Sequence, residues 1–123
     1  MNVENYINLC GSASVLLDTL YFGAGNSFHE SMIYGTPTVT MPSESLKSRI
    51  VLGAYKQMKI DNPPVVKSID EYVEKAIELA NLEEKKMLET KKYYSNNEKK
   101  YLFENQNFLK EFKDILVDIY KSK

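Results

Sequence analysis

A glycine-rich turn holds the residues of this sequence whose types and spacing are best suited to chemistry. Residues 21–31 read YFGAGNSFHES and lie between the apolar run SVLLDTL and the segment MIYGTPTVTM. Gly23 and Gly25 allow positive φ angles and a close approach of the main chain to a ligand. A plain turn from a strand into a helix has a similar composition, so spacing alone leaves a binding loop and a structural turn both open.

The start of the following helix adds hydrogen-bond donors to this loop. A helix that begins near residue 26 presents free N–H groups and a partial positive charge, which favour an anion such as a diphosphate. The side chains of Asn26 and Ser27 point to the same place, and either one is expected to cap the helix. Glu30 lies one turn further and is able to accept hydrogen bonds from a vicinal diol such as a ribose.

Other reactive residues form no recognisable catalytic set. His29 is the single histidine and neighbours Glu30 on a helix, where adjacent residues do not face the same cleft, so we interpret it as a packing or surface residue. Cys10 is the single cysteine and is interpreted as packing, so no metal site is expected. Asp18 with Glu30, or Glu44 alone, are acid–base candidates by residue type only. The catalytic residues are therefore unknown.

Periodicity places the turn between two strands. The run around residues 15–19 is predicted to be a central strand that is buried on both faces, and TPTVTM predicts a second strand after a helix that Gly35 closes. A helix with apolar residues at Val3, Tyr6, Ile7 and Cys10 precedes them and ends at Gly11. Loops at the carboxyl ends of parallel strands are where open α/β sheets bind ligands.

The second half of the chain reads as helices. One apolar stripe is expected after the second strand, formed by Leu46, Ile50, Val51, Ala54 and Met58, and NPPVV offers a third short strand. Ser68 and Glu71 have the spacing of a capping box for a helix that runs to about Ala80. A charged helix is expected over 82–94, then a polar linker. The final helix carries an apolar face, which is expected to lie along a core, formed by Phe108, Leu109, Phe112, Ile115, Leu116 and Ile119.

Composition limits the classes of protein that remain. The chain has 123 residues, so we expect one domain, with a site-bearing α/β part over 1–66 and charged helices over 67–123. Its formal net charge of -1 lacks the basic excess of a nucleic-acid binder. No apolar run approaches the ~20 residues of a membrane span, and the N-terminus lacks a signal pattern. We therefore expect a cytoplasmic protein without nucleic-acid or membrane partners.

The amino-acid sequence of the loop and its flanks resembles the C-terminal catalytic region of the O-linked N-acetylglucosamine transferase and SPINDLY family, bacterial type. The resemblance covers about residues 4–80. The matching positions are Leu17, Asp18, Phe22, Gly23, Gly25, Asn26, Glu30, Gly35, Thr36, Pro37, Val39, Thr40, Pro42 and Arg49.

The resemblance implies a fold and a function. The fold would be a Rossmann-like three-layer fragment, half of the donor-binding domain of a two-domain GT-B glycosyltransferase. The donor would be a nucleoside-diphosphate sugar such as UDP-GlcNAc, transferred to Ser or Thr of a protein acceptor, with no further cofactor or metal. It implies that Gly23, Gly25, Asn26 and Ser27 hold the diphosphate and that Glu30 holds the ribose.

Some positions and the length depart from that family. Ala24, Ser27, Ser31 and Ser43 replace its usual residues, and Ala24 is expected to weaken phosphate contact because it stands where the family has glycine. The family's acceptor-binding half has no counterpart here, so we expect the isolated chain to be inactive. It would need a chain that supplies this half, or it would self-associate. The alternative is a non-catalytic nucleotide-binding or protein-interaction module.

Overall fold

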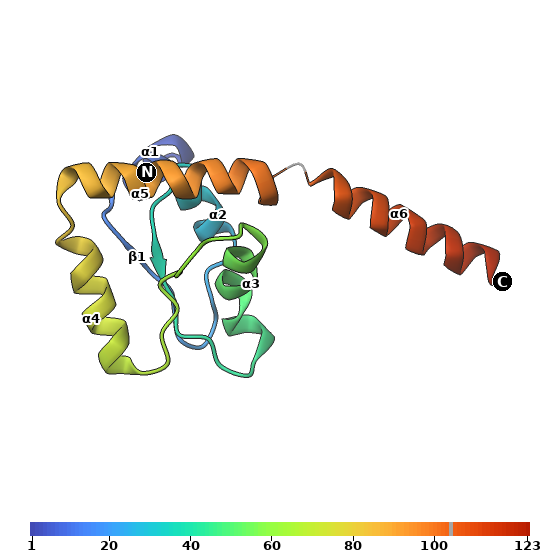
Figure 1. Ribbon diagram of the computed structural model, residues 1–123, viewed down its shortest axis with the longest axis horizontal. Helices are drawn as coiled ribbons and strands as arrows, with labels where there is room; N and C mark the ends of the chain where they lie inside the picture. The colour runs from blue at the N-terminus through green and yellow to red at the C-terminus, as the bar shows by residue number, and fades with distance from the viewer. Residues whose placement is uncertain (104) are drawn as a thin grey trace.

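Two short parallel strands, β1 (Leu16–Leu17) and β2 (Thr38–Val39), form the sheet of the computed structural model, which describes residues 1–103 and 105–123. Helices surround the strands (Figure 1). They are α1 (Val3–Ser12), α2 (Asn26–Met32), η1 (Leu46–Ser48), α3 (Ile50–Gln57), α4 (Ile69–Ala80), α5 (Glu84–Asn97), the π-helical η2 (Glu98–Leu102) and α6 (Gln106–Lys121).

The order of strands and helices agrees with the sequence prediction, but the burial of the first strand does not. Leu16 pairs with Thr38 and Leu17 with Val39, and the expected third strand is reduced to one parallel bridge between Thr40 and Val65. The side chain of Leu17 is 52% exposed. The prediction of a strand buried on both faces was therefore wrong, because β1 lies at the edge of the described sheet.

Two apolar cores give the fold its three layers. Val39 of β2 packs with Val66 and with Leu79 of α4. The second core lies among α2, α3 and α5 and includes Phe28, Met32, Val51, Tyr55, Met58 and Tyr94. Figure 1 shows α4 on one side of the strands and α2 and α3 on the other, so the predicted three-layer α/β architecture is confirmed.

Local signals in the sequence explain where several helices begin and end. Ser68 accepts a hydrogen bond from the Glu71 N–H at 3.2 Å, and the Glu71 carboxylate accepts from the Lys67 N–H at 2.8 Å, which confirms the predicted cap of α4. Gly35 follows α2 with a φ of +72°, as expected of a glycine that ends a helix. The backbone of Lys91 passes so close that a Cβ at Gly35 would lie 1.8 Å from the Lys91 carbonyl oxygen.

Two predictions for the second half need correction. The expected apolar stripe is incomplete, because Leu46 lies in η1 and is exposed, whereas Val51, Ala54 and Met58 are buried. The segment expected to be a polar linker is helical as far as Leu102, because Asn97 donates a side-chain hydrogen bond to the Met58 carbonyl and Leu102 packs on the core. Residue 104, also part of the expected linker, lies outside the described residues.

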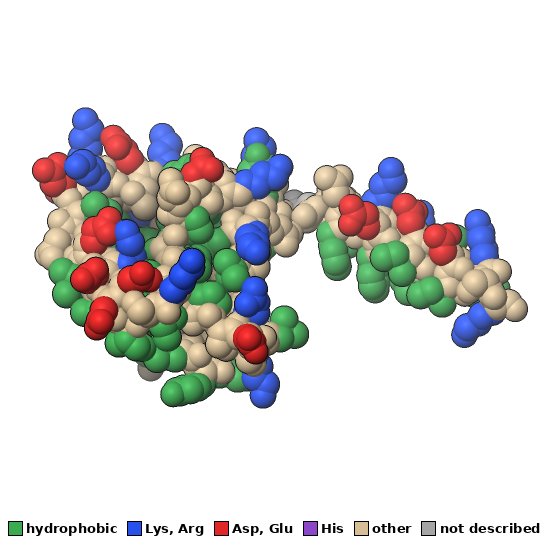
Figure 2. Space-filling model, turned by 60° about the horizontal axis from the view of Figure 1, so that its bottom comes forward, with side chains coloured by type: hydrophobic (Ala, Val, Ile, Leu, Met, Phe, Trp, Pro, Cys, Tyr) green, Lys and Arg blue, Asp and Glu red, His purple; other side chains and the backbone are tan. Residues whose placement is uncertain are grey.

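The prediction that the last helix lies along a core was wrong. Figure 1 shows α6 pointing away from the rest of the molecule, and all of its residues are exposed. Its apolar side chains gather on one side of the helix (Figure 2). Phe108 and Ile115 are 59% and 56% exposed, so the amphipathic pattern is real, but nothing among the described residues covers its apolar face.

Within the described residues, no helix is both long enough and apolar enough to cross a bilayer. Cys10 is buried, in agreement with its interpretation as a packing residue.

Candidate functional site

The loop between β1 and α2 is held at two consecutive backbone N–H groups. The Gly23 N–H donates to the Lys47 carbonyl at 2.7 Å, and the Ala24 N–H donates to Asp18 Oδ1 at 2.6 Å. A Cβ at Gly23 would lie 2.9 Å from the Lys47 carbonyl oxygen, so glycine is needed there for close packing. The expected use of positive φ is not observed, since within the described residues Gly35 is the glycine that has it.

Asn26 and Ser27 are the first residues of α2, not its caps, so that prediction was wrong. Gly25 occupies the N-cap and no side chain caps the helix. The first backbone hydrogen bond of the turn runs from the His29 N–H to the Gly25 carbonyl at 3.3 Å. The N–H groups of Asn26, Ser27 and Phe28 therefore have no acceptor within the helix, as at any helix start.

A cavity of about 400 Å³ lies beside this loop. It is lined by residues of α1, β1 and the turn: Tyr6, Leu16, Leu17, Thr19, Phe22, Gly23, Ala24, Gly25 and Ser27. Its position at the carboxyl end of a parallel strand is the usual location of ligand sites in open α/β sheets. Its volume falls within the range of small-molecule sites.

The structure brings some of the predicted site residues to this cavity and leaves others beside it. Gly23, Gly25 and Ser27 line it. Asn26 is exposed at the start of α2, and Glu30 is half-buried one turn further along; neither lines the cavity. Ala24 packs against the apolar core and has no positive φ, so alanine fits this loop without strain.

Tyr6 is a cavity residue that the sequence prediction missed. Its spacing with Val3, Ile7 and Cys10 indicated only a helix with an apolar face. The side chain is half-buried and supplies an aromatic wall opposite the loop. Nothing in the spacing distinguishes a core aromatic residue from one that lines a cavity, because the distinction depends on how α1 packs on α2.

A lysine of α5 holds α1 in place. The Lys91 ammonium donates to the carbonyl of Gly11 at 2.6 Å and to the carbonyl of Ala13 at 2.7 Å, at the C-terminal end of α1. Burial lowers the pKa of Lys91. Because cations are favoured at helix C-termini, this contact fixes the helix that carries Tyr6.

The acid–base candidates do not form a catalytic pair. Asp18 is 3% exposed, and its Oδ2 accepts from the Thr40 hydroxyl at 2.6 Å while Oδ1 accepts from Ala24. The carboxylate is thus turned inward, and Tyr72 donates to the Asp18 carbonyl at 2.6 Å. Burial, and then the charge of Asp18, raises the pKa of Tyr72. Asp18 and Glu30, acid–base candidates by residue type only, therefore do not act as a pair, because both Asp18 carboxylate oxygens are engaged inside the fold.

The other reactive residues also stay apart. The ring of His29 lies edge-on to Phe28 at 5.5 Å between centroids, which fits its interpretation as packing. Glu44 is exposed. In the part of the chain that the structure describes, no three His, Cys, Asp or Glu side chains form a group suited to a metal ion.

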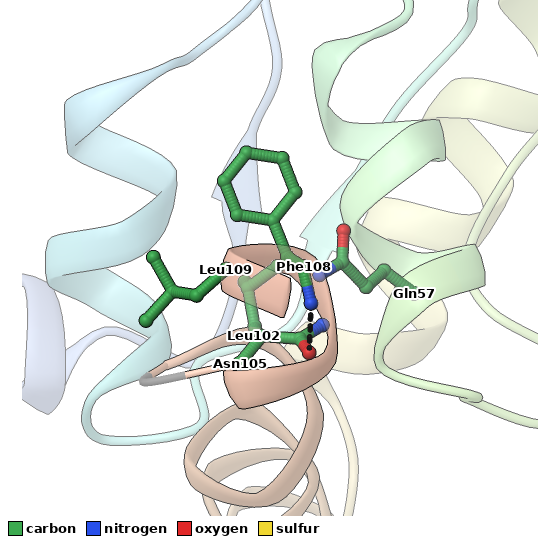
Figure 3. Close-up of a pocket in the computed structure, with 5 residues that line it drawn as sticks. All are labelled: Gln57, Leu102, Asn105, Phe108 and Leu109. Carbon is green, nitrogen blue, oxygen red and sulfur yellow. Dashed lines mark hydrogen bonds between the residues drawn. The ribbon is translucent and has the colours of Figure 1, made fainter. Parts of the chain in front are cut away.

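Two further cavities of similar or larger volume lie elsewhere on the molecule. One of about 650 Å³ lies on the other side of the loop and includes Ser43, Ser45, Lys47 and Lys67. Another of about 420 Å³ lies where α6 begins (Figure 3), among Gln57, Leu102, Asn105, Phe108 and Leu109, with the Asn105 side chain accepting from the Phe108 N–H at 3.1 Å. No predicted site residue lines the cavity at α6.

Comparison with solved structures identifies a protein of the same fold. The chain superposes on a K341M mutant of the O-GlcNAc transferase of Thermobaculum terrenum with a TM-score of 0.75 and 18% sequence identity, over 99% of this chain. The chain spans 22% of the length of that protein. No protein-family model matches the chain, and no curated protein sequence matches it significantly. The sequence resemblance stated above thus has a counterpart in the fold.

Proposed function

We propose that this chain is the nucleotide-sugar-binding portion of a glycosyltransferase that modifies Ser or Thr of proteins. The observation that carries the proposal is the cavity beside the loop of residues 23–27. It lies at the carboxyl end of a parallel strand, in a fold like that of an O-GlcNAc transferase. The glycines proposed from sequence are also those that line it.

Residues that line the cavity, together with Asn26 and Glu30 beside it, would offer one contact for each part of a nucleoside diphosphate that extends past the cavity onto the first turn of α2. The Tyr6 ring provides a stacking surface for a base, an interaction worth ~1–3 kcal/mol. The free N–H groups at the start of α2, together with Asn26 and Ser27, would hold the diphosphate. Glu30 would accept from the ribose hydroxyls. Because the start of a helix carries a partial positive charge that favours an anion, the proposal invokes no metal ion.

The chemistry that this portion would contribute is stabilisation of the leaving group. Fixed N–H donors stabilise the charge that develops on a departing diphosphate. No acid–base pair is assembled among the described residues, so we propose that sugar transfer requires polypeptide outside this chain.

Two exposed surfaces support the proposal that a further polypeptide binds this chain. The outer edge of β1 is unpaired in the described sheet, and an open strand edge invites pairing. The apolar side of α6 is exposed along its length (Figure 2). An acceptor-binding half and a second copy of this chain are the two candidates, and light scattering distinguishes them.

Isothermal titration with UDP, GDP and inorganic pyrophosphate tests the proposal. Glu30→Ala should weaken UDP more than pyrophosphate, because pyrophosphate has no ribose hydroxyls to lose. Asn26→Ala should weaken both by roughly ten- to a hundred-fold. UDP binding that neither substitution changes would remove the site. Sugar transfer by the isolated chain would contradict the proposal that transfer requires polypeptide outside this chain.

The alternative is a non-catalytic interaction module, which the exposed face of α6 favours. It predicts that neither nucleotide binds while α6 mediates association. The same titration, with light scattering beside it, separates the two functions.

A further inference from the structure

Asp18 makes four hydrogen bonds, two through its backbone and two through its carboxylate, that join β2, α4 and the loop before α2. Its own N–H donates to Val39 of β2 at 3.0 Å, and its carbonyl accepts from Tyr72 of α4. Its two carboxylate oxygens accept from Thr40 and Ala24, each at 2.6 Å. A buried carboxylate is stable only when its oxygens are satisfied, and here both are.

The contact to Ala24 sets the path of the binding loop. The loop follows β1, which ends at Leu17, and enters α2 at Asn26, and Ala24 is the last residue before the N-cap Gly25. Because Gly25 makes no side-chain cap, nothing at the cap itself fixes the entry of the chain into the helix. The bonds at Gly23 and Ala24, together with the bond from the Thr19 hydroxyl to the Phe22 carbonyl, therefore set the path of the loop into α2.

The chemistry of this contact favours a carboxylate over a neutral group. Hydrogen bonds to an ionised acceptor are shorter and roughly twice as strong as those between neutral groups. The second oxygen is held by the Thr40 hydroxyl, which orients the carboxylate toward the loop. Asn at this position keeps the shape, and its NH₂ group can donate to the Thr40 hydroxyl, but its oxygen is a neutral acceptor, so the bond from the Ala24 N–H loses its charge assistance and weakens.

We propose that Asp18 is a positioning residue for the binding cavity: its carboxylate fixes the Ala24 N–H and so holds Gly23 to Ser27 against the ligand. This rests on the proposed function. Asp18 is not among the residues that line the cavity, so it acts through the loop and does not touch the ligand. The resemblance and the fold assign no such role to it.

The test compares Asp18→Asn with Tyr72→Phe. Both remove a hydrogen bond from the same residue, but Tyr72→Phe removes the one at the Asp18 carbonyl and leaves the carboxylate intact. In ¹H–¹⁵N NMR spectra, Asp18→Asn should shift the Ala24 amide signal and speed its hydrogen exchange about ten-fold. Tyr72→Phe should leave both unchanged.

Titration with UDP and with pyrophosphate provides the second readout. Asp18→Asn should weaken both about ten-fold, since the loop that faces the diphosphate is displaced. Tyr72→Phe, at a similar loss of stability, should bind both as the wild type does. Equal weakening by the two variants would show a general structural role and overturn the proposal, as would an unchanged Ala24 amide in Asp18→Asn.

The two proposals fail in different ways. If the wild-type chain binds neither UDP nor pyrophosphate, the proposed function fails, while the Ala24 amide still decides whether Asp18 fixes the loop. If Asp18→Asn does not fold, exchange in the wild type decides: the Ala24 amide should be protected relative to Tyr21 and Phe22, and exchange as fast as theirs would contradict the contact.

Discussion

The Tyr55 hydroxyl bonds both backbone groups of Thr38. It accepts from the Thr38 N–H at 2.8 Å and donates to the Thr38 carbonyl at 2.9 Å. These groups lie on the edge of β2 that faces away from β1, because backbone groups alternate between the two edges of a strand. A third strand reaches that edge only at Thr40. One side chain of α3 thus replaces the missing strand at Thr38.

Tyr55→Phe should lower the free energy of unfolding by about 1–3 kcal/mol, since it leaves a buried N–H and a buried carbonyl unsatisfied. Urea unfolding followed by circular dichroism measures the change. Tyr21→Phe is the control, because Tyr21 is 90% exposed. Equal stability of the two variants would show that the hydroxyl is dispensable.

Stability should fall at alkaline pH. Burial raises the pKa of Tyr94 to about 12 and also raises that of Tyr55, whereas the unfolded residues ionise near 10. Above pH 10 the unfolded chain binds fewer protons than the folded one, so the free energy of unfolding decreases with pH. Below pH 10 both tyrosines stay protonated in the folded and unfolded chains, so their full contribution to the free energy of unfolding is present. Urea unfolding between pH 8 and about 12 should show a shallower fall for Tyr94→Phe than for the wild type, and identical slopes would exclude Tyr94 as a cause.

Gly35→Ala should destabilise the protein by more than about 1 kcal/mol, because the residue has positive φ and the Lys91 backbone occupies the place of a Cβ. Gly53→Ala is the matched control. Gly53 lies inside α3 with no atom within 4 Å of its Cβ position, so the same substitution should stabilise by about 0.5–1 kcal/mol. Thermal unfolding of both variants tests the opposite signs, and a common sign would contradict this account.

Glu98→Gln should stabilise the protein at neutral pH by about 1 kcal/mol. Glu98 is 2% exposed, its Oε1 has no partner among the described residues, and burial raises its pKa, although Lys99 lowers it. Above the unfolded value of 4.5, the unfolded chain gives up this proton more readily than the folded chain does, so wild-type stability falls as pH rises.

The gain in Glu98→Gln should therefore vanish below that pH, which urea unfolding at pH 4 and pH 7 would reveal. Glu89→Gln, at an exposed position of α5, should change neither value. A gain that persists unchanged at acid pH would indicate a cause other than the buried charge.

Combining Phe112→Glu with Ile115→Glu should reduce self-association of the chain without changing the stability of the part of the molecule that precedes α6. Both side chains are more than half exposed, on the apolar side of α6. Light scattering should show larger species for the wild type than for the variant at high concentration. Asn107→Glu adds charge to the polar side and should behave as the wild type. A wild-type chain that remains monomeric would exclude self-association through α6, and a different protein would remain as the candidate partner.

The sequence predicted the elements of the first half because their signals are local. Gly35 and the β-branched residues around Val39 act within a few residues, as Ser68 does in the second half, and each of these elements was found. The burial of Leu17 was misjudged because an apolar run has the same pattern whether or not a neighbouring strand covers it. The cover of α6 was misjudged for the same reason: an amphipathic pattern shows that a face needs a partner but does not locate one.

The candidate site was predicted in part. The glycine loop lines a cavity, as its composition suggested, yet Tyr6 joins it from a helix whose packing no local signal specifies. Asp18 was an acid–base candidate by residue type only. Its role in the structure depends on Thr40 and Ala24, and only the folded chain brings these three residues together.

The contact of Lys91 with Gly11 and Ala13 has a consequence for the order in which the chain is built. The paired residues are 80 and 78 positions apart, so the ribosome must release most of the chain before α1 can be tied down. Until then, the helix that carries Tyr6 is held by α2 and by the Thr36 hydroxyl, which donates to the Cys10 carbonyl, but its C-terminal end lacks the lysine contact. Ordering of the cavity wall should therefore be a late event of synthesis, and truncated translation products that end before α5 should leave α1 open to proteases.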